Sequence, residues 1–106
     1  MPNALDVFLD QTPWRRQAYN EICATPTGQL VSYGVIADIV DVSPRNIGWL
    51  RRELYRILSH ETNVPLHRVA CQGDVYSLKD SEKTRQVNTR LRTKEGSLQD
   101  PVWRTK

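Results

Sequence analysis

Residues 33–54, with the sequence YGVIADIVDVSPRNIGWLRREL, decide the fold of this chain. Their first part predicts a short helix, because Ile36, Ala37 and Val40 recur at the spacing of one buried helical face. A tight turn follows, in which Ser43 is expected to cap the next helix while the proline after it opens that helix. The stretch therefore predicts two short helices joined by a turn.

The second helix is predicted to run from Arg45 to about Leu58. Its apolar residues share one side and are expected to pack inward; they are Ile47, Leu50, Leu54 and Ile57 or Leu58. This order of features is typical of a helix-turn-helix: a small alanine in the first helix, a tight turn, and a second helix that such apolar residues hold against the core. We therefore expect a DNA-binding domain of the helix-turn-helix class.

The outward face of this second helix is rich in arginine. One interpretation is an ordinary solvated face, since arginines commonly occupy such positions. The other is a recognition helix that contacts DNA, and we favour it because the turn and the charge coincide. The outward residues are Arg45, Asn46, Arg51, Arg52 and Arg56.

Two further helices are expected outside this stretch. Thr12-Pro13 predicts the start of an earlier helix, because threonine caps and proline fits the first turn. A last helix begins at Ser81, carries Val87 and Leu91 inward and is closed by Gly96. These signals predict a fold that is mainly α-helical.

Short extended segments complete the predicted fold. Residues 29–32 are expected to form half of a small β hairpin, and residues 75–78 resemble a second short strand. Trp103 would be unusual in a free tail, so the end of the chain is expected to dock back onto the domain. The fold class predicted is therefore mainly α with a small β hairpin, as in a winged-helix-like helix-turn-helix DNA-binding domain.

Length and composition are those of one small globular domain. The 106 residues are 39% hydrophobic and 25% charged, and we expect residues 1–106 to form a single domain. No apolar run approaches the ~20 residues that a membrane span needs, and no secretory signal is visible. The two cysteines make no disulfide framework, so a reducing cytoplasmic or nuclear setting is expected.

Charge is distributed unevenly along the chain. Residues 1–44 have a net charge of −3, whereas residues 45–106 have a net charge of +6. A basic half of this kind favours a polyanion as partner, although charge alone does not identify nucleic acid.

The residue pattern does not favour a metal site, a cofactor site or the catalytic triad of a hydrolase. Cys23, His60, His67 and Cys71 lack the paired spacing of a zinc site, and the glycines are too scattered for a phosphate loop. His67 is best interpreted as a hydrogen-bonded core residue with Glu95 as a candidate partner. A cysteine at position 66 would complete a relay that makes a thiolate, but Leu66 has no such chemistry.

Five motifs together resemble the O6-alkylguanine-DNA alkyltransferase superfamily, in the family's order and over about residues 14–96. The first three segments resemble its V-[ST]-Y-G-x-I-A, R-x-V-G and P-C-H-R-V motifs, with isoleucine for valine in the second and leucine for cysteine in the third, and the last two resemble its Y-S and late L-x-x-x-E-G motifs. In this chain they are Val31-Ser32-Tyr33-Gly34-Val35-Ile36-Ala37, Arg45-Asn46-Ile47-Gly48, Pro65-Leu66-His67-Arg68-Val69, Tyr76-Ser77 and Leu91-Arg92-Thr93-Lys94-Glu95-Gly96.

The sequence is most similar to the alkyltransferase-like proteins of that superfamily, in which the acceptor cysteine is replaced. His60-Glu61-Thr62 and a tryptophan near the C-terminus add to this likeness. The resemblance implies a non-enzymatic protein without cofactor, which binds double-stranded DNA containing O6-alkylguanine and flags the lesion for nucleotide excision repair. It also implies a monomer in the bacterial or archaeal nucleoid or the eukaryotic nucleus.

The resemblance further assigns roles to individual residues. Tyr33 and Arg45 would flip the damaged nucleotide out of the stack, and His67 and Glu95 would be the remnant of the relay. Arg51 and Arg52 are rival candidates for the intercalating residue. Leu66, Val69, Tyr76 and Ser77 would line the lesion pocket, and the other DNA contacts would come from Ser32, Gly34, Asn46, Arg51, Arg52 and Arg56.

Two other functions stay open at this point. A helix-turn-helix of this kind can also serve a transcription regulator that reads the major groove. The third possibility is an atypical alkyltransferase that uses Cys71 as its acceptor.

Overall fold

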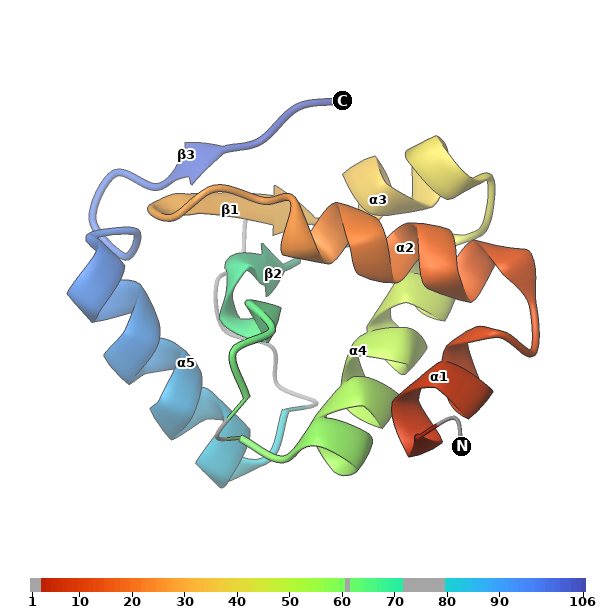
Figure 1. Ribbon diagram of the computed structural model, residues 1–106. Coiled ribbons are helices and arrows are strands. Elements are labelled where there is room, and N and C mark those ends of the chain that lie inside the picture. Colours follow the sequence, from red (N-terminus) through yellow and green to blue (C-terminus); the bar gives the residue numbers. More distant parts are fainter. Residues whose placement is uncertain (1–2, 61, 72–79) are drawn as a thin grey trace.

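The computed structural model describes residues 3–60, 62–71 and 80–106 (Figure 1). The chain is mostly helical with a small sheet, which confirms the predicted class. None of its described helices is long and apolar enough to cross a bilayer. The elements are α1 (Ala4–Leu9), α2 (Pro13–Cys23), β1 (Gln29–Ser32), α3 (Tyr33–Val40), α4 (Pro44–Leu58), the 3-10 helix η1 (Leu66–Arg68), β2 (Val69–Ala70), α5 (Glu82–Glu95) and β3 (Val102–Trp103).

The helices α3 and α4 form the predicted helix-turn-helix. The hydroxyl of Ser32 accepts a hydrogen bond of 3.1 Å from the amide of Val35 and so caps α3. Asp41 ends that helix in the left-handed conformation, with φ 59°. Pro44 opens α4 as expected, but Ser43 makes no side-chain capping bond within the described residues, which corrects that part of the prediction.

The sheet is parallel where a hairpin was expected. Its order is β2-β1-β3, with Val31 opposite Val69 and Leu30 opposite Trp103. Parallel neighbours need a crossover connection, and the helix-turn-helix supplies it between β1 and β2. The strand expected at residues 75–78 lies outside the described residues. Within the described residues, β2 and β3 both run parallel to β1, so neither forms a hairpin with it.

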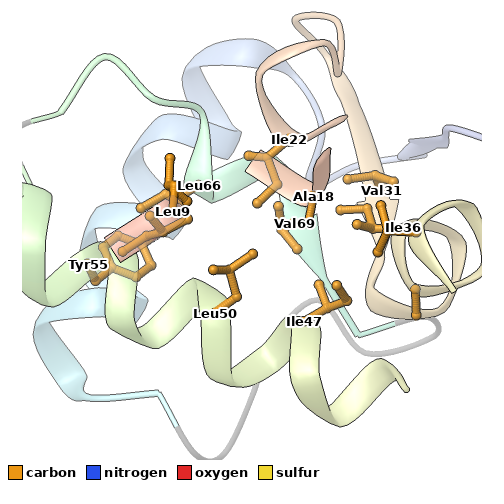
Figure 2. Packing of buried hydrophobic residues seen from close by; sticks show 13 residues of the cluster. Leu9, Ala18, Ile22, Val31, Ile36, Ile47, Leu50, Tyr55, Leu66 and Val69 are labelled. Carbon is orange, nitrogen blue, oxygen red and sulfur yellow. The ribbon is translucent and has the colours of Figure 1, made fainter. Parts of the chain in front are cut away.

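The core lies where α4 meets the sheet and the N-terminal helices. Figure 2 shows Leu50 of α4 and Val69 of β2 pointing toward one another within this cluster. The predicted inward residues of α3 and α4 are buried there as far as Leu54, whereas Ile57 and Leu58 are half-buried. Leu9 of α1 is also fully buried, although sequence analysis missed this helix. A signal was present, because Asn3 caps α1 by accepting the amide of Asp6 at 2.8 Å.

The buried face of α5 is polar. Val87 and Leu91, which were expected to face inward, are half-buried. The positions buried instead are Thr84, Asn88 and Arg92. They pack against groups that need hydrogen bonds, as when the hydroxyl of Tyr55 donates to Asn88 Oδ1 at 2.6 Å.

The end of the chain docks onto the domain, as expected. Trp103 pairs with Leu30 in the sheet, and the amide of Arg104 donates to the carbonyl of Leu30 at 2.7 Å. The guanidinium of Arg104 also binds Glu21 of α2. Strand β3 is thereby fixed at the edge of the sheet (Figure 1).

Candidate DNA interface

The outer face of α4 carries the exposed cations. Arg45, Asn46, Arg52 and Arg56 are all exposed, as predicted for a recognition helix. Arg56 forms a surface ion pair with Glu53 one turn earlier. Neither Arg45 nor Arg52 has an ion pair with any residue that the structure describes, so both guanidinium groups are free to meet a phosphate or a base.

Arg51 is buried, which corrects its assignment as a phosphate contact or an intercalating residue. Only 1% of it is exposed. Its Nη1 donates to Asp80 Oδ1 at 2.8 Å and to the hydroxyl of Tyr33 at 3.3 Å, and its Nε donates to the carbonyl of Leu66 at 3.4 Å. A side chain held in this way joins three parts of the fold and cannot reach DNA. Arg45 and Arg52 remain as candidates for intercalation.

Tyr33 lies at the start of α3 and packs directly on α4. A Cβ added to Gly48 would lie 3.3 Å from Cε2 of Tyr33, so the glycine makes room for this ring. The ring is half-buried, and burial raises the pKa of Tyr33. Of the other predicted contacts near it, Gly34 is half-buried, while Ser32 is buried and uses its hydroxyl as a cap.

The expected pairing of His67 with Glu95 is confirmed. His67 Nε2 lies 2.8 Å from Glu95 Oε2, and Arg68 binds both carboxylate oxygens at 3.0 and 2.7 Å. Burial alone would raise the pKa of Glu95, but the hydrogen bonds from Arg68 and His67 lower it to about 2. Burial lowers the pKa of His67, although its bond to Glu95 opposes that shift.

His67 and Glu95 form a hydrogen-bonded pair, and the residue before His67 has no nucleophilic atom. Because the Glu95 carboxylate is ionised and only accepts hydrogen bonds, Nε2 of His67 must carry the proton. Leu66 precedes this histidine and places a buried hydrocarbon side chain there. A thiolate is needed for transfer of an alkyl group to cysteine, and no such group exists at this position.

Replacing Glu95 with glutamine is expected to flatten the dependence of stability on acid pH. The folded-state pKa of Glu95 is lowered from 4.5 to about 2. A lowered carboxyl pKa stabilises the fold above the unfolded-state pKa, and this contribution is lost as the pH falls from about 5 to about 2. Urea unfolding across that range should therefore show a steeper loss for the parent than for Glu95→Gln, which should also be less stable at neutral pH. Parallel curves for the two proteins would contradict this assignment.

The predicted lesion pocket is only partly within the described residues. Leu66 and Val69 are both buried in the core, with 1% and 0% of their surface exposed. Tyr76 and Ser77 lie outside the described residues. An open depression of about 210 Å³ was not expected from the sequence, because its walls come from α4 and from the start of α5, which are far apart in the chain. It is lined by Arg52, Tyr55, Asp80, Ser81 and Thr84.

The cysteines do not form a site in the described part of the chain. Cys23 is exposed and Cys71 is half-buried, and both are free thiols. No group of three or more potential metal ligands occurs within residues 3–60, 62–71 and 80–106. The alternative acceptor, Cys71, lies just after β2.

The fold and the exposed face of α4 define a helix-turn-helix protein of the DNA-binding class. Neither a known family profile nor a curated protein matches the sequence. Among solved structures, the chain is similar to Atl1 of S. pombe, crystallised in complex with damaged DNA containing O6-carboxymethylguanine. The two are 29% identical with a TM-score of 0.66, over 79% of this chain and 76% of Atl1. This likeness confirms the resemblance to the alkyltransferase-like proteins.

Proposed function

We propose that this protein binds double-stranded DNA containing O6-alkylguanine and does not repair the lesion itself. The observation that carries the proposal is the structural likeness to Atl1 bound to damaged DNA. Leu66 at the position of the acceptor supports the non-enzymatic part. The protein would recognise the lesion as a monomer, without a cofactor, and pass it to nucleotide excision repair proteins in the nucleoid or nucleus.

Recognition would proceed by flipping the damaged nucleotide out of the duplex. Extruding a base costs a few kcal/mol of stacking and pairing, and less when the pair is already weakened. Arg45 or Arg52 would fill the vacated space, since both are exposed and without an ion pair among the described residues. Tyr33 would guide the rotation of the backbone from the neighbouring helix. The depression beside Arg52 would receive the extruded base.

Replacing Arg45 or Arg52 with alanine separates the two candidates. The intercalating residue is expected to lose lesion discrimination, because the gap left by the flipped base is no longer filled. Arg56→Ala is the control on the same exposed face, and it should only reduce affinity and the salt slope by about one phosphate contact. Affinities for modified and unmodified duplexes, measured for each variant at two salt concentrations, give the answer. Full discrimination in both Arg45→Ala and Arg52→Ala would contradict the intercalation proposal.

The helix-turn-helix itself favours one alternative, a transcription regulator. Such a protein would prefer one DNA sequence and be indifferent to the lesion. An atypical enzyme that uses Cys71 would instead gain the mass of the alkyl group after incubation with alkylated DNA, whereas our proposal expects an unchanged intact mass.

A further inference from the structure

A second surface lies beside the recognition helix, where the starts of α2 and α4 meet. It is an open hollow of about 500 Å³, which we call the aromatic shelf. A volume of this size is typical of sites for small ligands. Its two tryptophans belong neither to the predicted lesion pocket nor to the depression beside α5. The shelf is lined by Trp14, Arg15, Arg45, Asn46, Trp49 and Arg52.

The aromatic side of the shelf packs against Arg15 and Phe8. The ring centroids of Trp14 and Trp49 are 6.4 Å apart and tilted by 50°. The guanidinium of Arg15 lies 4.5 Å from the Phe8 ring centroid and 4.9 Å from that of Trp49. Arg15 Nη1 also donates to the carbonyl of Phe8 at 3.0 Å and to Gln11 Oε1 at 2.9 Å. These contacts hold Trp49 between Arg15 and Trp14.

The shelf is strongly positive. Arg15, Arg45 and Arg52 contribute to it, and no carboxylate is found among its lining residues. The Nε atom of Arg15 is buried and has no hydrogen-bond partner among the residues that the structure describes. Because this atom is covered by the protein, Arg15 contributes its positive charge to the hollow and not a hydrogen bond from Nε. Arg45 and Arg52 stand at the exposed rim, where they can pair with phosphate.

This combination of groups matches the chemistry of an unpaired nucleotide. A base stacks on aromatic faces whatever its identity, while arginines neutralise its phosphate and an amide such as Asn46 bonds a base edge. We propose that the aromatic shelf binds one unpaired nucleotide of a DNA strand. The inference deepens the proposed function, because it assumes that the same end of α4 meets DNA. Arg52 lines both the shelf and the depression beside α5, so the two hollows adjoin one side chain. While the depression receives the damaged base, the shelf would hold another nucleotide of the DNA that has lost its pairing partner.

Titration with a single-stranded oligonucleotide tests the shelf directly. The probe is an oligothymidylate of about eight nucleotides, compared with a strand of equal length and charge in which every base is missing. Stacking on an aromatic side chain contributes about 1–3 kcal/mol per base, which corresponds to about 5- to 150-fold in affinity. We expect the oligothymidylate to bind at least about fivefold more tightly than the abasic strand and to quench tryptophan fluorescence. All proteins carry Trp103→Phe, so that the fluorescence reports Trp14 and Trp49.

Matched variants identify the surface. Trp49→Leu is expected to remove the difference between the two probes, whereas Trp49→Phe keeps a ring and should retain most of it. Trp14→Leu is the second test if Trp49→Leu fails to fold. Arg85→Ala removes an exposed charge from α5 and should leave the difference intact.

The outcomes separate the shelf from the proposed function. Equal binding of the base-bearing and abasic strands would overturn the shelf, as would full base-dependent binding by both Trp49→Leu and Trp14→Leu. Lesion preference is measured separately on duplex DNA. A protein that prefers the lesion but fails the probe comparison keeps the proposed function and loses the shelf. Base-dependent binding without lesion preference would support the shelf while overturning the proposed function.

Discussion

Replacing Arg51 with methionine is expected to lower the free energy of unfolding by about 3–5 kcal/mol, because it strands a buried carboxylate. Asp80 would lose the partner that now lies 2.8 Å away, and its side chain is only 7% exposed. The same change removes the donors to Tyr33 and to the carbonyl of Leu66. Chemical unfolding monitored by circular dichroism gives the value.

Two controls identify the cause of this loss. Arg56→Met removes an arginine from the exposed side of the same helix and should change stability by less than about 1 kcal/mol. Arg51→Met combined with Asp80→Leu removes both charges, and it should recover part of the loss if the stranded carboxylate is the main cost. A loss below about 1 kcal/mol for Arg51→Met alone would mean that the buried pair is not important for stability.

Replacing Arg92 with methionine is expected to lower the free energy of unfolding by about 2–4 kcal/mol, since hydrogen bonds from a charged donor contribute about 1.5–3 kcal/mol each. Arg92 is 2% exposed. Its Nε donates to the carbonyl of His67 at 2.6 Å, and its Nη2 donates to the carbonyl of Val69 at 3.1 Å. The change would remove the donors to the backbone carbonyls of His67 and Val69.

The matched control for this change lies on the same helix. Arg90 is exposed, so Arg90→Met should alter stability by less than about 1 kcal/mol. Hydrogen exchange provides a second measurement. The amides of residues 66–70 should exchange faster in Arg92→Met than in Arg90→Met, when each variant is measured at the same denaturant concentration below its own unfolding midpoint. Equal stability of the two variants would contradict a structural role for Arg92.

The helix-turn-helix was predictable because its signals are local. Ile36, Ala37, Ile47 and Leu50 repeat at helical spacing, and Pro44 marks the start of a helix whatever lies around it. The structure places all four apolar residues in the core. Signals of this kind depend on neighbours in sequence, so one chain is enough to interpret them.

The buried arginines were not predictable in the same way. Arg51 and Arg52 are adjacent and chemically identical, yet one is buried and the other exposed. The difference depends on Asp80, which is 29 residues away in sequence and approaches Arg51 only in the fold. The polar inner face of α5 escaped prediction for the same reason, since Asn88 is buried against Tyr55 of α4. Burial of charge depends on such distant partners.

In the candidate site, too, some contacts could be predicted from the sequence and others could not. Glu95 was a candidate partner of His67 because a histidine in an apolar segment needs a hydrogen-bond partner, and the structure confirms the pair. The aromatic shelf had no motif to reveal it. Trp14 and Arg15 lie in a helix whose role in packing explained their spacing, and only the fold brings them to Trp49.

Comparison of two otherwise identical duplexes tests the central claim most directly. One contains a single O6-methylguanine, the other contains guanine at that position, and the dissociation constant of each complex is measured at one salt concentration. Our account predicts that the modified duplex binds at least about tenfold more tightly, which corresponds to about 1.4 kcal/mol, with no change in the intact mass of the protein. Equal dissociation constants for the two duplexes would contradict it.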